Sequence, residues 1–110
     1  MTFSIERMGD VTVVDVEGEL TVSNRGELKE RVLARLDEGD RSFVIDFDGT
    51  GYIDSSGLGV LVSLSKRIRE AEGRLRLAGL NQELRVLFEL TKLDTLFQIV
   101  DSRATALGDL

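Results

Sequence analysis

The 110-residue sequence contains no histidine, no cysteine and no proline. The missing histidine removes the commonest general base and metal ligand, and the missing cysteine removes disulfides and thiolate metal sites. Together these absences argue against most hydrolytic and metal-dependent chemistry, and no cofactor is expected. Since proline is absent as well, glycine, asparagine and aspartate must provide the turns.

Basic residues are also fewer than acidic ones. Twenty acidic residues against 14 Lys and Arg give a formal net charge of −6. Binding to nucleic acid depends on cationic side chains that displace counterions from phosphate, so a nucleic-acid partner is not expected. A protein partner with a basic face suits this charge better, although the same charge also serves simply to keep a small protein soluble.

Long apolar runs are missing too. No stretch approaches the length of a membrane span, and the N-terminal residues lack the basic then apolar order of a signal peptide. We therefore expect a cytoplasmic protein without membrane contact. With 42% hydrophobic and 31% charged residues the composition is globular, and the length fits one domain over residues 1–110.

The first half of the chain switches between two periodicities. Phe3 to Arg7 and Val11 to Glu17 are β-branched runs that predict a hairpin. A helical pattern follows, in which Asn24 is the predicted N-cap and Glu27 completes a capping-box-like pair. Phe43 to Phe47 is apolar throughout, which predicts a central strand. The residues expected on the inner face of the first helix are Leu28, Val32, Leu33 and Leu36.

The second half continues the alternation. A helix is predicted to end at Gly73, in the position that favours a left-handed residue, and Arg74 to Ala78 alternates like a strand with one wet face. A third helix and a strand at Phe97 to Val100 follow, and Asp101 is the expected cap of a C-terminal helix. The inward-facing residues of the two helices are predicted to be Leu58, Leu61, Val62, Ser65 and Ile68, then Leu84, Leu87 and Phe88.

Strands that alternate with helices imply parallel crossover units, to which the hairpin adds an antiparallel pair. The predicted fold class is α/β: a mixed four- to five-stranded sheet with about four helices packed on one face. This arrangement would place the turn after the central strand at the start of the second helix.

That turn reads Asp-Ser-Ser-Gly, from Asp54 to Gly57. Either Asp54 or Ser55 would suffice as the N-cap. If Ser55 caps the helix, Ser56 takes the first helical position and can face solvent, while Gly57 leaves room for a large group to approach. A helix N-terminus tolerates phosphate, so phosphorylation of Ser56 would change the surface charge rather than unfold the domain. A plain capping role is the simpler alternative.

Catalytic interpretations of the same turn are weaker. Ser56 has no histidine to act as its base, and the turn does not match the Gly-x-Ser-x-Gly nucleophile elbow. The glycines Gly49, Gly51, Gly57 and Gly59 lack the spacing and the lysine of a phosphate-binding P-loop. An enzymatic role is therefore not expected.

The pattern as a whole resembles a STAS domain, specifically the stand-alone bacterial anti-sigma factor antagonists. The resemblance runs through "VIDFDGTGYIDSSGLGVLVSLSKRIREAEGRLRLAGLNQELRVLFELTKLDTLFQIVDS", and "VVDVEGEL" fits the strand and turn that precede it. Its most specific part extends from Ile53 to Leu61. The resemblance implies the STAS fold and a function in the regulation of transcription.

In that family, the resemblance implies, the unmodified antagonist binds an anti-sigma factor that is also a serine kinase, which frees the sigma factor. The kinase binds ATP and magnesium itself and phosphorylates the serine directly before the glycine, here Ser56. The phosphorylated antagonist releases its partner, and a separate metal-dependent serine phosphatase resets it. This chain would then be a substrate and a binding partner.

The same resemblance suggests which residues surround the phosphoacceptor. Asp54, Ser55 and Gly57 would shape the turn, and Gly59 and Val60 would contribute exposed helix positions. The loop after the second strand usually reads Gly-x-Leu-Asp, but this chain has Thr21 in place of the Asp. Residues from this loop that are candidates for partner contact are Glu19, Thr21 and Asn24.

Alternatives stay open at this stage. Ser55 and Thr21 are the other candidate phosphoacceptors. Two other functions are a STAS scaffold of a signalling complex, which would show stable higher-order assembly, and a small-ligand or nucleotide sensor, which a ligand would stabilise.

Overall fold

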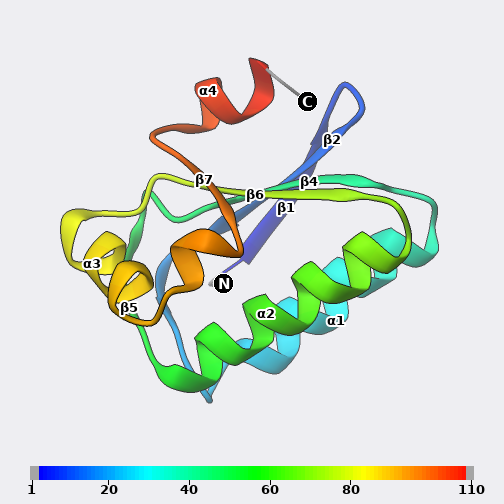
Figure 1. Ribbon diagram of the computed structural model, residues 1–110. Coiled ribbons are helices and arrows are strands. Elements are labelled where there is room, and N and C mark those ends of the chain that lie inside the picture. The colour runs from blue at the N-terminus through cyan, green and yellow to red at the C-terminus, as the bar shows by residue number, and fades with distance from the viewer. Residues whose placement is uncertain (1–2, 109–110) are drawn as a thin grey trace.

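A computed structural model describes residues 3–108 (Figure 1), so the first two and last two residues of the predicted domain lie outside the described residues. A five-stranded mixed sheet has the order β1-β2-β4-β6-β7. The expected hairpin is confirmed, because β1 and β2 are antiparallel, and every other pairing in this sheet is parallel. The strands are β1 (Phe3–Met8), β2 (Val11–Val16), β4 (Ser42–Asp46), β6 (Arg74–Ala78) and β7 (Gln98–Val100).

A second, two-stranded sheet was not expected from the sequence. It pairs β3 (Gly18–Leu20) with β5 (Thr50–Ile53) in parallel. β3 leads into the first long helix and β5 into the second. The helices are α1 (Arg25–Asp37), α2 (Ser55–Glu70), α3 (Gln82–Leu90), the 3₁₀ turn η1 (Leu93–Thr95) and α4 (Arg103–Gly108).

The main core lies between one face of the large sheet and helices α1, α2 and α3. β4 is the middle strand, as its apolar composition predicts, and Phe43 and Ile45 point into this core. Phe88 of α3 packs edge-on against Phe97, with ring centroids 5.8 Å apart. Fully buried leucines from the helices complete the layer, including Leu28, Leu61 and Leu64.

The opposite face of the sheet corrects the prediction that the helices pack on one face only. Helix α4 lies across this face, opposite α1 and α2 (Figure 1), and covers Val13 and Val44 with Ala106. The predicted wet face of β6 is wrong for the same reason. Arg76 is only 6% exposed, and its guanidinium donates to the Ala106 carbonyl at 3.2 Å.

Two helix-end predictions are also corrected. The left-handed residue after α2 is Glu72, with φ of 64°, whereas Gly73 is needed because a Cβ there would lie 2.4 Å from the Arg41 carbonyl oxygen. At α4, the Ser102 hydroxyl accepts from the Thr105 amide at 3.3 Å, while Asp101 pairs with Arg85. None of the helices within residues 3–108 combines the length and apolar character needed to cross a membrane.

Candidate functional site

The small sheet brings two loops together. In the parallel pair of β3 and β5, Leu20 lies opposite Ile53, so both strands end at the same edge. The Asp54 amide then donates to the Leu20 carbonyl at 3.1 Å. As a result, the loop that precedes α1 lies beside the Asp-Ser-Ser-Gly turn that begins α2, although about thirty residues separate them in the sequence.

Asp54 is the N-cap of α2, which resolves the choice left open between Asp54 and Ser55. Its backbone is extended, and its Oδ1 accepts from the Gly57 amide at 2.8 Å. Ser55 is therefore the first helical residue and Ser56 the second, one position later than the alternative in which Ser55 caps. The other carboxylate oxygen accepts from the Val22 amide at 3.1 Å, so the same side chain also holds the neighbouring loop.

The Ser56 hydroxyl donates to Asp54 Oδ1 at 2.8 Å. Ser56 is half-buried and Ser55 is exposed. Both serines therefore lie at the surface in the first turn of α2, where free backbone amides favour negative charge. A serine nucleophile would need a base with a suitable pKa, and an ionised carboxylate at a helix cap is a poor one.

Hydrogen bonding lowers the pKa of Asp54 below its ordinary value. The Gly57 amide is the largest cause, and the Ser56 hydroxyl and the Val22 amide act in the same direction, while partial burial opposes them. Each of these donors stabilises the ionised carboxylate. The turn therefore carries a fixed negative charge directly beside the Ser56 hydroxyl at neutral pH.

Gly57 has a different role from the one expected. It is buried rather than open to an approaching group, and a Cβ at this position would lie 2.5 Å from the Leu20 carbonyl oxygen. The glycine thus lets the first turn of α2 pack directly on the end of β3. Gly59, in contrast, is exposed and a Cβ there would meet no atom within 4 Å.

The predicted capping box at Asn24 is wrong. Asn24 is the N-cap residue of α1, but its side chain makes no capping hydrogen bond. Its Oδ1 instead accepts from the Thr21 amide at 2.9 Å, and its amide group donates to the Glu19 carbonyl at 2.8 Å. Asn24 therefore fixes the loop itself. Thr21 is 8% exposed and its hydroxyl shares a hydrogen bond with Ser23 at 2.9 Å.

Val60 is not a surface residue. It is 6% exposed and belongs to the main core. The structure thus brings together all the other predicted partner-contact residues at one end of the molecule: Glu19, Thr21, Asn24, Asp54, Ser55, Ser56, Gly57 and Gly59.

Two exposed apolar residues of this end were missed by the sequence analysis. Val22 is 67% exposed and Tyr52 is 57% exposed. Val22 follows β3 and donates its amide to Asp54, while Tyr52 lies on β5 opposite Glu19. The sequence of β5 gave no clear signal, because the strand does not alternate: buried Thr50 and Ile53 flank exposed Gly51 and Tyr52. Single exposed apolar side chains are common on protein surfaces, so these two matter here because both lie next to the Asp-Ser-Ser-Gly turn.

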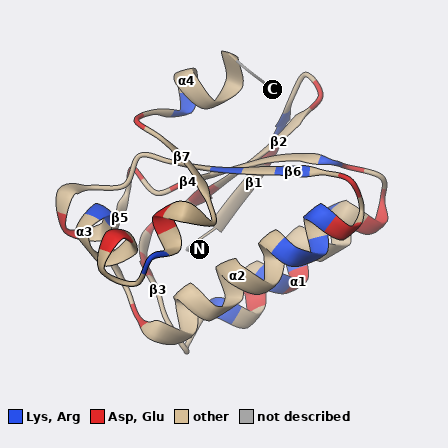
Figure 2. Cartoon of the chain, in the orientation of Figure 1, with Lys and Arg blue, Asp and Glu red and all other residues tan. Residues whose placement is uncertain are grey.

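The site carries acidic charge at Asp54 and Glu19 and one exposed basic residue, Arg25, at the start of α1. The basic residues of α2 lie in its second half (Figure 2), and the first of them is Lys66. Glu19 of β3 is exposed near the site, whereas the exposed Glu17 and Asp48 precede β3 and β5 and lie at the opposite end of the small sheet. Residues 3–108 hold no group of three or more acidic side chains that is arranged to bind a metal ion.

Comparisons with known proteins agree with this architecture. The description "STAS domain" matches residues 2–106. An anti-sigma-B factor antagonist of Staphylococcus aureus is 31% identical over 86 residues, which make up 78% of this chain and 80% of the relative. The resemblance predicted from the sequence is confirmed.

Solved structures share the fold. A Thermotoga maritima protein, provisionally named an anti-sigma factor antagonist, superimposes with a TM-score of 0.92 at 27% identity over 97% of this chain and 92% of that one. The anti-sigma factor antagonist SpoIIAA of Bacillus in its phosphorylated form gives a TM-score of 0.76 over 96% of each chain, and at 18% identity this likeness concerns the fold. The chain therefore belongs to the STAS domain family, and its relatives within that family are named anti-sigma factor antagonists.

Proposed function

We propose that this protein, as a single STAS domain over residues 1–110, is an anti-sigma factor antagonist that acts by partner switching. Its unphosphorylated form binds an anti-sigma factor that is also a serine kinase, and phosphorylation of Ser56 releases that partner. The observation that carries the proposal is the placement of Ser56 in the first turn of α2, beside an apolar and acidic surface built from two loops.

The family pattern favours Ser56, which directly precedes the glycine, over Ser55. Thr21 is less suitable as an acceptor because the residue is buried and its hydroxyl is already bonded to Ser23. Ser56 needs only to break one hydrogen bond, to Asp54, to become available to a kinase. Ser55 stays a candidate that the experiment below separates from Ser56.

A phosphate on Ser56 would have two opposing effects. The free amides at the start of α2 favour its negative charge, so the helix should survive modification. The phosphate would add about −1.5 to −2 charges next to the ionised Asp54. SpoIIAA, which has the same fold, exists in a phosphorylated form. The main effect is therefore on a partner, which would have to bury this concentrated charge.

The surface around Ser56 suits a partner with an apolar groove and a basic rim. Val22 and Tyr52 supply the apolar contacts, and Glu19 contributes an acidic edge. Opposite charges across such an interface would speed association and fix its orientation. The phosphoryl donor is ATP bound by the partner with its magnesium, and a separate serine phosphatase removes the phosphate. The chain itself needs no cofactor and acts in the cytoplasm as a substrate rather than a catalyst.

The test uses Ser56→Ala and Ser56→Asp as baits in lysate of the producing organism, with Ser55→Asp as the matched control. We expect the alanine form and the Ser55→Asp form to retain an ATP-binding serine kinase, identified by mass spectrometry, and the Ser56→Asp form to lose it. With the kinase purified, ATP should phosphorylate the wild type and Ser55→Ala but not Ser56→Ala.

Equal retention of the kinase by Ser56→Ala and Ser56→Asp would contradict the switch and favour a scaffold. Continued phosphate incorporation into Ser56→Ala would move the acceptor to Ser55 or Thr21. Circular dichroism of each variant provides the folding control, because the proposal requires Ser56→Asp to fold normally.

A further inference from the structure

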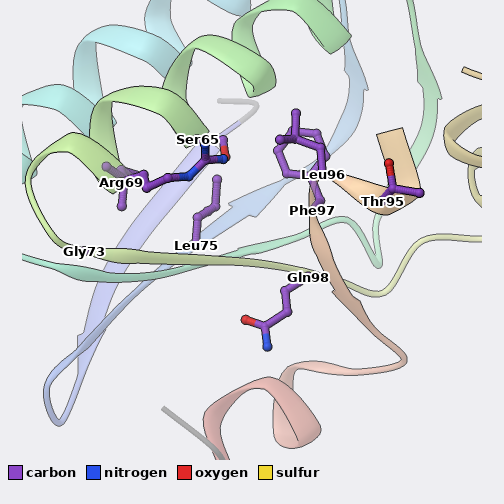
Figure 3. A pocket seen from close by; sticks show the side chains of 9 residues that line it. Ser65, Arg69, Gly73, Leu75, Thr95, Leu96, Phe97 and Gln98 are labelled. Atoms are coloured by element: carbon purple, nitrogen blue, oxygen red, sulfur yellow. The ribbon is translucent and has the colours of Figure 1, made fainter. Parts of the chain in front are cut away.

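A hollow of about 300 Å³ lies at the other end of α2 (Figure 3). It is bounded by the second half of α2, the start of β6, and the chain that runs from η1 into β7. Ser65 is nine residues after Ser56, which corresponds to about 14 Å along a helix. The hollow is therefore separate from the proposed partner-binding site. Its principal lining residues are Ser65, Ile68, Arg69, Leu75, Leu96 and Phe97.

Two features of the fold create this space. Ser65 occupies a position on the buried face of α2 where the pattern otherwise places large residues such as Leu61 and Ile68. The pairing of β6 with β7 begins only at Arg76, so Leu75 lies beside the free part of the β6 edge. A small side chain above an unpaired strand edge leaves a hollow that the core does not fill.

Part of the lining of the hollow is apolar and partly open to water. Ile68 and Phe97 are buried, Leu75 is half-buried, and Leu96 is 39% exposed. Placing an apolar group against Leu75 and Leu96 would remove this surface from water, which is favourable in proportion to the area covered. The volume is at the lower end of the range for small-molecule sites.

Arg69 places a positively charged side chain at the rim of the hollow. Arg69 extends along α2 toward Ser65, above Leu75 (Figure 3), and donates to the Ser65 hydroxyl at 3.3 Å. In the described part of the chain no aspartate or glutamate forms an ion pair with Arg69. A guanidinium has five donors in a planar fork that matches a carboxylate, so most of its donors are available to a ligand.

From this combination we propose that the hollow is a binding site for a small organic carboxylate with an apolar body. The carboxylate would pair with Arg69 and accept from Ser65, and the apolar body would lie on Leu75, Leu96 and Phe97. A charged head beside an apolar floor selects an amphipathic anion over a neutral molecule or an inorganic ion. This inference goes beyond the proposed partner switch and does not depend on it.

The test is a titration of the ¹⁵N-labelled full chain, followed by NMR, with benzoate as the probe. Benzyl alcohol is the neutral comparison and inorganic phosphate the comparison without an apolar body. We expect benzoate to cause saturable shifts of the amides of Ser65, Leu75 and Phe97, and the other two compounds to bind at least tenfold more weakly.

Three variants sharpen the test. Arg69→Gln should weaken benzoate binding by about tenfold or more, as expected for the loss of a charge-assisted hydrogen bond. Arg67→Gln removes the same charge from a neighbouring exposed position that does not line this hollow and should leave the affinity unchanged. Ser65→Leu should abolish binding by filling the space.

The proposal is overturned if benzoate causes no saturable shift at these amides, if benzyl alcohol or phosphate binds as well as benzoate, or if Arg69→Gln and Arg67→Gln have equal effects. Should Ser65→Leu fail to fold, the two arginine variants still decide the outcome. None of these results depends on the kinase-binding experiments with Ser56.

Discussion

The starts of α1 and α2 begin from similar sequences but form different structures. Each helix follows a strand of the same two-stranded sheet, and each is preceded by an Asn or Asp residue with a glycine in the first turn. Asp54 has an extended backbone and caps α2 through the Gly57 amide. Asn24 has φ of −132° and ψ of −3° and makes no side-chain cap.

The difference lies in where each polar side chain finds its partners. Asn24 bonds only within its own loop, to Thr21 and Glu19, whereas Asp54 bonds to its own helix and to Val22 of the neighbouring loop. Asp54 is therefore a link between two segments, and Ser56 donates directly to it. The start of α2 therefore joins the two halves of the proposed site, whereas the side-chain hydrogen bonds of Asn24 at the start of α1 stay within one loop.

The two helix starts should differ most in how the free energy of unfolding responds to substitution of their first-turn glycines, Gly57 in α2 and Gly26 in α1. A Cβ at Gly57 would lie 2.5 Å from the Leu20 carbonyl oxygen, while at Gly26 it would meet nothing within 4 Å. Gly57→Ala should therefore lower the free energy of unfolding by about 1–3 kcal/mol, and Gly26→Ala should raise it by about 0.5 kcal/mol. Urea denaturation measures both, and equal effects at the two positions would remove the packing role of Gly57.

The two helix starts should also differ in how much stability depends on the N-cap residue, Asp54 in α2 and Asn24 in α1. Asp54→Ala removes the acceptor for Gly57, Ser56 and Val22. It should destabilise the protein less than Gly57→Ala but more than Asn24→Ala, because it releases both the helix end and the adjacent loop. Hydrogen exchange should show faster exchange at the Val22 and Gly57 amides. Unchanged exchange at Val22 would show that Asp54 does not link the loops.

Because Asp54 is charged, its contribution to the free energy of unfolding depends on pH, whereas that of the neutral Asn24 does not. Because the pKa of Asp54 is lowered in the folded state, chiefly by the Gly57 amide, its stabilising effect is present above the usual aspartate pKa. The effect is lost as the pH falls through the lowered folded value. The difference in the free energy of unfolding between wild type and Asp54→Asn should thus be largest near neutrality and shrink in acid.

Asp40 also makes the free energy of unfolding depend on pH, and in the same direction as Asp54. The contribution of Asp54 must therefore be measured against a reference variant. The pKa of Asp40 is lowered mainly by the Thr12 hydroxyl, against the effect of burial, with help from Arg7 and Arg35. Taking the difference between wild type and Asp54→Asn at each pH cancels this contribution. A difference that stays constant from neutral to acid pH would show that the charge of Asp54 is unimportant to stability.

Among the substitutions that destabilise the protein, Asn24→Ala is expected to have the smallest effect. It removes hydrogen bonds to the Thr21 amide and the Glu19 carbonyl, which should cost about 1 kcal/mol in the free energy of unfolding. Since the side chain of Asn24 makes its hydrogen bonds to Thr21 and Glu19 and none to Asp54 or Ser56, exchange at Gly57 should not change. A large effect on Gly57 would mean that the two helix starts are coupled through this loop as well.

Local sequence patterns predicted most of the large sheet and the long helices correctly. The apolar run around Phe43 and Ile45 marked the central strand, and the period of Leu58, Leu61 and Ile68 marked the inner face of α2. These signals are reliable because burial on one face repeats with the geometry of each element. The start of α2 was narrowed to Asp54 or Ser55, and the structure decided for Asp54.

The errors share one cause, which is contact between segments distant in the sequence. The alternating pattern of β6 predicts that Arg76 lies on the wet face of the strand, but α4 covers it. Gly57 was expected to leave open space, yet the Leu20 carbonyl fills it. Val60 was expected at the surface, yet it is buried in the main core, and Tyr52 is exposed on β5, which pairs with β3 in the small sheet. A local sequence pattern cannot predict such contacts, because the contacting segments are far apart in the chain.

Residue types and their spacing were enough to indicate the long helices, the strands of the large sheet, the acidic character of the chain and its family, but not the small sheet of β3 and β5. The tertiary structure alone decided that Asp54 and Val22 meet, that apolar side chains flank Ser56, and that a hollow forms beside Arg69. The physical reason is that strand pairing and helix packing bring together residues far apart in the chain, and their partners then set exposure, hydrogen bonding and charge.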